Sequence, residues 1–308
     1  MAMTDNVRGS ILMTVSMAAF VTNDTLMKVV FETIPVAQTL FFRGLIATSL
    51  ILLMAWRTGA LFYRAPRSDL PALILRAIGE VGATGFFMLA LSNIPIANAV
   101  AVLQAAPLAV TMAAALFLGE EVGWRRWSAI GVGFVGMLII VQPGAEGFNA
   151  YALYAVLAVF FITLRDIGTR RLAPGTPTLW ASVLSAAIVT IGSGLIIPLE
   201  GWRPMGGTQY LLVFGASLFV IVGYVTHVGS VRFGEISAVA PFRYTVLIFA
   251  LMLGFLIFGE IPDTMTLVGG AVVTGAGLYT IWRERRLGRS ISARASSRPF
   301  NSDLKSDA

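Results

Sequence analysis

Charged and polar side chains interrupt the long apolar stretches of this chain at a few positions. Arg76 and Glu80 stand four residues apart in one stretch, and Asn23 and Asp24 are adjacent in another. A single Arg or Asp at the centre of a membrane-spanning helix costs about 2.5–3.5 kcal/mol even on lenient insertion scales. Such groups must be paired, hydrated or functional. The chemistry open to them is the binding of a polar ligand or the transfer of a proton.

Glu80 is the leading candidate for that chemistry. At 1.5 Å per residue it lies about 16 Å along its predicted helix, near the middle of a hydrocarbon layer about 30 Å thick. Its carboxylate is expected to bind a cationic or hydrogen-bonding ligand group, or to accept a proton. The alternative is a structural ion pair between Arg76 and Glu80, because residues four apart share one face of a helix.

Arg243 and Tyr244 form a second candidate site, because Pro241 distorts the helix that carries them. Gln104 aligns with Tyr244 at an offset of 140 residues, and Pro107 follows it. The pattern predicts matching polar groups in two related, distorted helices. The alternative for Arg243 is a side chain that extends to the membrane surface.

The remaining candidates are isolated polar residues. Arg43 is either a ligand clamp or a structural partner of helix-end carbonyls, and His227, the one histidine, is either a proton relay or structural. The predicted substrate-binding residues are Glu80, Arg243, Tyr244, Gln104, Asn23, Asp24, Arg43 and His227. We predict no catalytic residue and no metal ligand.

Apolar segments of bilayer length position these residues. The chain is 57% hydrophobic and 12% charged, against roughly 25% charged in an ordinary soluble domain. Each crossing needs about 20 apolar residues. Ten helices are predicted, at about 9–30, 35–56, 70–91, 95–118, 124–142, 150–170, 177–199, 208–231, 236–259 and 264–283. The predicted fold is all-α and integral to a membrane.

A duplication relates the two halves of the chain. Glu120 and Glu260 each follow a glycine that closes a Leu/Phe-rich run, 140 residues apart, and we interpret them as markers of helix ends. Because each half holds five helices, an odd number, the second half must be inverted in the membrane. The prediction is two inverted five-helix repeats, 1–145 and 146–284, followed by a disordered cytoplasmic tail, 285–308.

Charge pairs also recur between the repeats. Asp24 and Lys28 match Asp166 and Arg170, with the same spacing of four residues. Inversion places the two pairs on opposite faces of the membrane, where they are either pseudo-symmetric gates or interfacial anchors.

The basic residues gather on one side of the predicted membrane. With both termini in the cytoplasm, seventeen of the 22 Lys and Arg fall on that side, and two, Lys28 and Arg203, fall on the other. This asymmetry follows the positive-inside rule. Topology therefore explains the basic charge without a nucleic-acid partner, and the predicted partners are the lipid bilayer and a small-molecule substrate.

Several function classes lose support from what the sequence lacks. It has no cysteine, no phosphate-binding G-x-x-x-x-G-K-[ST] loop and no H-E-x-x-H motif, so neither direct ATP hydrolysis nor a metal or other cofactor is predicted. A channel and an intramembrane enzyme using Asp24 and Asp166 remain as competing classes. Because no nucleophile or metal motif accompanies these aspartates, we predict that the protein is not an enzyme.

The chain resembles the drug/metabolite transporter superfamily, in particular its ten-helix EamA-type members. The resemblance rests on the two repeats, Arg43 within FFRGLIA, Arg76 near the start of the third helix, the segment QAAPLAV, and Gly-Glu after helices four and nine. It implies transport, since proteins similar to this one move amino acids, nucleotide-related metabolites, siderophore-like compounds or vitamins. One bacterial branch takes up riboflavin.

We therefore predict a secondary transporter of the bacterial inner membrane that works by alternating access. Riboflavin uptake is the first substrate hypothesis, export of amino acids or related metabolites is the alternative, and an intramembrane enzyme is a distant one. Helices five and ten are rich in glycine, which permits close helix approach. The resemblance implies that they form a static wall or the interface of a homodimer.

Overall fold

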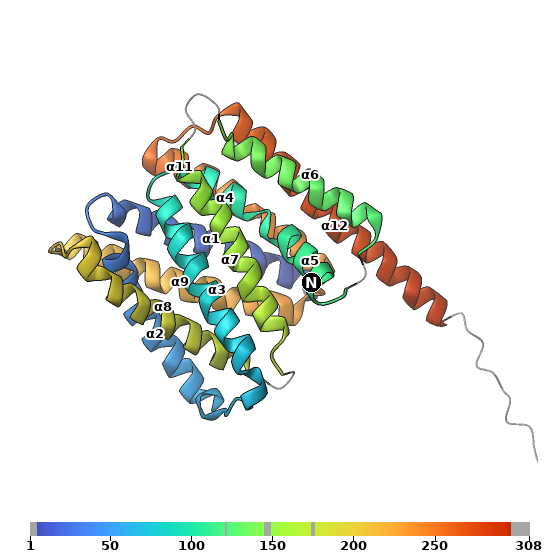
Figure 1. Cartoon of the computed structure of the whole chain (residues 1–308), viewed down its shortest axis with the longest axis horizontal. Coiled ribbons are helices and arrows are strands. Elements are labelled where there is room, and N and C mark those ends of the chain that lie inside the picture. The colour runs from blue at the N-terminus through green and yellow to red at the C-terminus, as the bar shows by residue number, and fades with distance from the viewer. Residues whose placement is uncertain (1–4, 121, 145–148, 174–175, 297–308) are drawn as a thin grey trace, which may run out of the picture.

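Long apolar helices dominate the described part of the chain in its computed structural model. The structure describes residues 5–120, 122–144, 149–173 and 176–296. Within those ranges, ten segments are long and apolar enough to span a bilayer, and Figure 1 shows them packed side by side. The predicted all-α, ten-helix membrane fold is confirmed.

The first repeat makes five crossings. These are α1 (Asp5–Phe31), α2 (Val36–Arg57), α3 (Leu70–Leu91), the pair α4 (Ile96–Leu103) and α5 (Ala106–Phe117), and α6 (Trp124–Val141). Two short 3-10 turns, η1 (Ala60–Phe62) and η2 (Arg67–Asp69), lie between α2 and α3.

The second repeat follows the same order. Its crossings are α7 (Ala152–Arg170), α8 (Thr178–Glu200), α9 (Gly207–Phe233), the series α10 (Ile236–Val239), η3 (Ala240–Tyr244) and α11 (Thr245–Phe258), and α12 (Thr264–Ser296). Because five crossings precede it, α7 runs opposite to α1, and the second repeat is inverted.

The end of α12 differs from the sequence prediction. A disordered tail was expected from residue 285, but α12 continues to Ser296, so residues 285–296 are helical. Arg, Leu and Ala are good helix formers, they supply much of this segment, and no proline interrupts it. The rest of the predicted tail, 297–308, lies outside the described residues.

Prolines divide the fourth and ninth crossings. Proline lacks an N–H, and its ring crowds the carbonyl four residues earlier. The fourth crossing accordingly breaks at Gln104 and Ala105, just before Pro107. Pro241 lies in η3, where the ninth crossing changes from α10 to α11. Both distortions agree with the sequence prediction.

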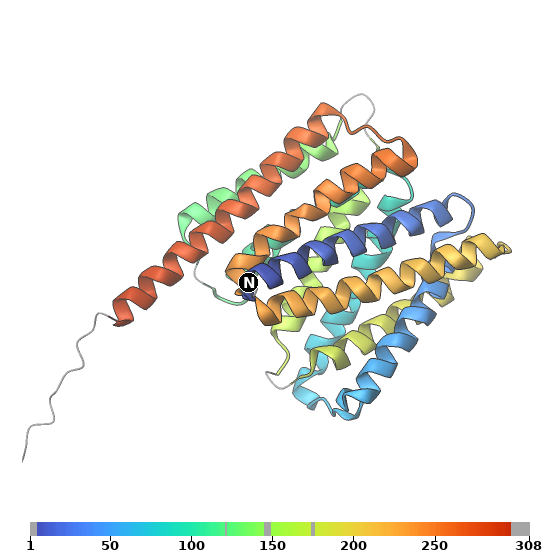
Figure 2. The same ribbon diagram turned by 180° about the vertical axis from the view of Figure 1, so that it is seen from behind.

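The two repeats are interlocked. Helix α3 of the first repeat packs along α7 of the second, and α1 packs along α9 in the equivalent way. Figure 2 shows α1, in dark blue, lying between α9 and α11 of the second repeat. Helix α2 also packs along α8, and α6 along α12. The strongest helix contacts therefore join the repeats to each other.

One hydrogen bond marks the pseudo-symmetry axis. Thr48 of α2 and Thr190 of α8 are equivalent at an offset of 142 residues, and their hydroxyl oxygens are 3.1 Å apart. Because a residue and its repeat equivalent touch only near the axis that relates them, the axis passes between α2 and α8. The side chains around this contact are the ones to examine for a central site.

Glycines permit the close approach of α6 and α12. A Cβ atom added at Gly136 would lie 2.9 Å from side-chain atoms of Val272 and Val273, and 3.0 Å from the Gly269 carbonyl oxygen. Gly131, on the same helix, has no atom within 4 Å of such a Cβ. These glycines lie in the predicted Gly-rich wall.

We expect Gly136→Val to lower the apparent melting temperature of the purified protein in detergent. Overpacking of a tight contact costs about 1–3 kcal/mol. Gly131→Val is the matched control on the same helix and should melt like the parent. Equal melting of the two variants would show that α6 and α12 do not pack this closely.

Candidate functional site

A polar cavity of about 610 Å³ lies between the repeats, beside the pseudo-symmetry axis. Its walls come from α1, α2, α3, α7, α8, α9 and η3. The polar residues that line it are Arg43, Thr48, Arg76, Glu80, Thr84, Arg165, Asp166, Thr169, Ser182, Ser185, Tyr224, His227 and Arg243. This volume falls within the range of about 300–1,000 Å³ that is usual for small-molecule sites.

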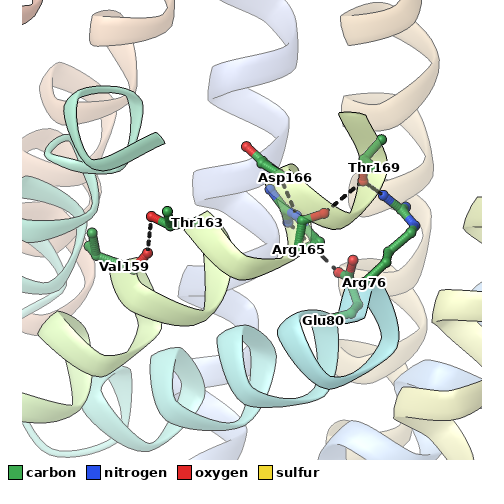
Figure 3. Close-up of polar contacts among 7 residues, drawn as sticks. All are labelled: Arg76, Glu80, Val159, Thr163, Arg165, Asp166 and Thr169. Atoms are coloured by element: carbon green, nitrogen blue, oxygen red, sulfur yellow. Dashed lines mark hydrogen bonds and ion pairs between the residues drawn. The ribbon is translucent and has the colours of Figure 1, made fainter. Parts of the chain in front are cut away.

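Glu80 faces an arginine of the other repeat. One Oε atom of Glu80 lies 3.9 Å from a terminal nitrogen of Arg165, whose Nε donates to Asp166 Oδ1 at 2.9 Å. Arg76 donates to the Thr169 hydroxyl. Figure 3 shows these side chains in the space between α3 and α7. The alternative of an ion pair between Arg76 and Glu80 is not observed, and both side chains instead contact residues of α7.

The close approach of α3 and α7 explains this exchange. A Cβ at Gly79 would overlap the Arg165 backbone, and a Cβ at Gly168 would lie 2.8 Å from the Arg76 nitrogen. With no side chain between the helices, long polar groups reach across rather than along α3. Glu80 thereby gives Arg165 a second carboxylate neighbour beside Asp166, which lowers the cost of its charge in the membrane.

Arg43 lies toward the opposite end of the cavity. One of its terminal nitrogens donates to Asn23 Oδ1 at 3.3 Å, and the Asn23 amide donates to Asp24 at 2.8 Å. Asn23 is 2% exposed. Asn23 and Asp24 are not among the lining residues, so the structure places them behind Arg43. Asn23 holds the Arg43 guanidinium, and Asp24 in turn holds the Asn23 amide.

Aromatic rings line the α9 side of the cavity. The Tyr224 hydroxyl is 2.9 Å from the Ser182 hydroxyl, and the Phe20 and His227 ring centroids are 6.4 Å apart. Arg243 lines the same region and is exposed. Flat faces next to hydrogen-bonding groups suit a planar organic ligand.

Several donors around the cavity lack protein partners. In the described part of the chain, the Nε atoms of Arg43 and Arg76 and the Nδ1 atom of His227 are buried without a hydrogen bond. Among the same residues, Arg243 has no ion pair or hydrogen bond. Because buried polar groups are nearly always satisfied, these atoms require water or a ligand.

Two predicted residues lie elsewhere. Tyr244 is 8% exposed, and its hydroxyl packs against α12 where a Cβ at Gly277 would overlap it. Gln104 lies at the break between α4 and α5. Neither lines the cavity. Glu80, Arg43, His227 and Arg243 are brought together, and Asn23 and Asp24 support them.

Sequence reasoning missed Arg165 as a site residue. Arg165 and Asp166 are the repeat equivalents of Asn23 and Asp24, at an offset of 142 residues. Aligning the first helix of each repeat residue by residue would have exposed this replacement of an amide by a guanidinium. Among the residues that the structure describes, the cavity is lined by four arginines, Arg43, Arg76, Arg165 and Arg243, but by two carboxylates, Glu80 and Asp166.

The positions of the lining residues show where the cavity lies across the membrane. We call the face at which α7 ends the Arg170 face, and the face at which α1 ends the Lys28 face. Thr169 lies next to the last residue of α7, and Arg243 precedes α11. Both line the cavity and are exposed, whereas Arg43 is seven residues from the other end. The cavity thus extends from the Arg170 face past mid-depth.

Ten crossings in two inverted repeats around a polar cavity define the class of inverted-repeat membrane transporters. The sequence profile of the EamA-like transporter family matches residues 7–142 and 149–282. The chain belongs to this family, a branch of the drug/metabolite transporter superfamily. It is a multi-pass membrane protein.

Named relatives transport different molecules. An S-adenosylmethionine uptake transporter of Rickettsia felis is 30% identical over 62% of this chain and 65% of its own length. A riboflavin transporter of Rhizobium johnstonii is 30% identical over 72% of each chain. The pseudopaline exporter CntI of Pseudomonas aeruginosa is 28% identical over 87% of this chain and 94% of its own. The chain thus matches slightly less than two thirds of the first relative.

A solved structure supports the fold. It superposes with a TM-score of 0.61 at 18% identity, covering 91% of this chain and 98% of the other. At this identity the match bears on the fold alone.

Because the chain has no natural cysteine, single introduced cysteines report directly on the cavity. We expect Thr84→Cys, on the cavity wall of α3, to react with a water-soluble maleimide at least about tenfold faster than Ala83→Cys. Ala83 is the control, 5% exposed in the core of the same helix. Similar rates at the two positions would contradict a water-filled cavity.

Proposed function

We propose that this protein is a secondary transporter that carries a small organic metabolite across the bacterial inner membrane by alternating access. The observation that carries the proposal is the polar cavity between the two inverted repeats. Glu80 lies ten residues into α3, or about 15 Å from its start, near mid-membrane. Central sites at a repeat interface are typical of such carriers.

The proposed orientation puts both termini and the Arg170 face in the cytoplasm. The helix bounds support it, since the basic ends of α2, α7 and α9 and the start of α6 share this face. The positive-inside rule favours that arrangement. The structure then corresponds to the inward-facing state, with repeats of 1–145 and 146–284. A homodimer through α6 and α12 stays a prediction.

Riboflavin is the proposed substrate, taken up from outside. It is planar and uncharged at neutral pH, with carbonyl and hydroxyl acceptors, which fits stacking surfaces such as Phe20 and Tyr224 beside unpartnered arginine donors. The excess of arginine disfavours a substrate with net positive charge. The riboflavin transporter of Rhizobium johnstonii, matched over 72% of each chain, adds support.

Export of amino acids or related metabolites is the rival function. The match to the pseudopaline exporter CntI favours it, because that alignment covers 94% of the exporter. A carboxylate-bearing substrate would also suit the arginines of the cavity. Direction and substrate therefore need one experiment that compares both.

Uptake in proteoliposomes separates these functions. We expect the parent protein to accumulate labelled riboflavin, and Glu80→Gln and Arg243→Ala each to reduce the rate at least about tenfold. Loss of a hydrogen bond to a charged group costs about 1.5–3 kcal/mol. Repeating the assay with and without a pH gradient shows whether protons drive uptake.

Arg57→Ala is the control. Arg57 is an exposed residue at the end of α2, outside the cavity, so its replacement should leave uptake unchanged. Unchanged uptake in both cavity variants would overturn the proposed site. Transport of amino acids without riboflavin transport would instead favour the export function.

A further inference from the structure

An ion pair on the Lys28 face also makes hydrogen bonds to the backbone of a neighbouring turn. Lys28 Nζ lies 2.6 Å from Glu260 Oε1, and the two side chains are 13% and 17% exposed. Lys28 Nζ also donates to the Ile94 carbonyl at 2.6 Å, and the Ile96 N–H donates to Glu260 Oε2 at 2.8 Å. The Lys28 ammonium, the Glu260 carboxylate, the Ile94 carbonyl and the Ile96 N–H therefore form one connected set of hydrogen bonds.

These contacts cross between two groups of helices. Helices α9 and α11 pack against α1, and helices α3, α4 and α5 pack against α7, while α4 and α11 form a direct contact between the two groups. Lys28 and Glu260 belong to the first group, whereas Ile94 and Ile96 flank the turn between α3 and α4 in the second. Glu260 supplies the side-chain cap that Pro95 cannot give to α4, at a helix N-terminus that favours a carboxylate.

Duplication places an equivalent ion pair on the Arg170 face. Arg170 is the repeat equivalent of Lys28, and Glu120 is that of Glu260. Their side chains also form an ion pair of 2.6 Å, but they are 45% and 49% exposed. This pair joins α7 to the end of α5, so both members belong to the second group of helices.

The pair of Arg170 and Glu120 differs from that of Lys28 and Glu260 in its contacts with the backbone. The repeat equivalents of Ile94 and Ile96 are Gly234, in the turn after α9, and Ile236, the first residue of α10. Among the described residues, neither Arg170 nor Glu120 makes a hydrogen bond to Gly234. This ion pair is therefore formed without a hydrogen bond to its counterpart carbonyl, on the face toward which the cavity extends.

We propose that these two ion pairs are latches that close the two faces in turn. Each pair stays formed, and closure consists of its capture of the carbonyl and N–H at the opposite turn: Ile94 and Ile96 on one face, Gly234 and Ile236 on the other. This inference rests on alternating access as proposed above. It gives Glu260 and Glu120, which we interpreted from the sequence as markers of helix ends, a role in closing the two faces together with Lys28 and Arg170.

The latch also replaces the expected pairs within single helices. Asp24 bonds with Asn23, and Asp166 with Arg165, so neither aspartate holds the base four residues later. Lys28 and Arg170 are free to pair with the glutamates that end the fourth and ninth crossings. Of the two alternatives for these bases, gates or interfacial anchors, the proposal takes the gate, with different acidic partners.

Access to a cavity cysteine from each face tests the latch without a known substrate. Thr84→Cys is the reporter, labelled in oriented vesicles with a membrane-impermeant thiol reagent. We expect Glu260→Gln to raise labelling from the Lys28 face at least about tenfold, because a charge-assisted hydrogen bond is lost. Glu120→Gln should lower labelling from that face, since the Arg170 face can no longer close.

A charge exchange separates a latch from an ordinary ion pair. Lys28→Glu combined with Glu260→Lys restores opposite charges but points a carboxylate at the Ile94 carbonyl and an ammonium at the Ile96 N–H. We expect the Lys28 face of this double variant to stay open. The single variant Lys28→Arg, which keeps a cationic donor at this position, should close that face as the parent protein does. Labelling of the exchanged pair at the parent's rate would overturn the latch. An ordinary salt bridge forms equally well when its acidic and basic residues are exchanged.

Folding and function have separate readouts in this design. The comparison is limited to variants that elute as a single species and in which an introduced Ala83→Cys still reacts slowly. Lys28→Gln is a second variant that disrupts the same latch. If both Glu260→Gln and Lys28→Gln leave labelling from the Lys28 face unchanged, the latch is wrong. If labelling shifts as expected but riboflavin uptake is absent, the substrate proposal fails while the latch stands.

Discussion

A charged side chain inside a membrane must have a polar partner, and the structure is arranged around this constraint. Glu80 and Arg165 come from different repeats and face each other across the gap between α3 and α7, while Arg43 is held by Asn23. The first contact depends on the close approach of α3 and α7 at Gly79 and Gly168. The donors left over, on Arg43, Arg76 and His227, converge on one cavity. The cost of burying them makes the cavity a place for water or a ligand.

Inversion of the repeats gives the two faces of the membrane related arrangements of helices around the cavity. Because α3 pairs with α7 as α1 pairs with α9, each group of packed helices contains parts of both repeats. In the proposed transport cycle, relative movement of the two groups would exchange the environments of the two faces. None of the four described arginines of the cavity has an arginine at the equivalent position of the other repeat, so the candidate site is asymmetric. The proposed cycle thus combines a pseudo-symmetric helix arrangement with an asymmetric cavity.

The number and order of helices could be predicted from the sequence because apolar length and proline position are local properties. The lining of the candidate cavity could be predicted only in part. Glu80 and Arg43 were found because charge in an apolar segment is visible along the chain, but Arg165 was hidden at a helix end rich in charge. Tyr244 was misplaced because the alignment gives the depth of a residue and not the direction of its side chain. The partners of Lys28 and Arg170 lie 232 and 50 residues away, beyond any local spacing rule.

The central claim is that the two faces of one cavity open in turn. Double electron–electron resonance between spin labels on introduced cysteines measures this directly, using repeat-equivalent pairs at Asn93 and Ile257 on the Lys28 face and at Phe233 and Phe117 on the Arg170 face. The account predicts that conditions which lengthen the first distance shorten the second, and that substrate changes their balance. Two distances that stay fixed, or that lengthen and shorten together, would contradict it.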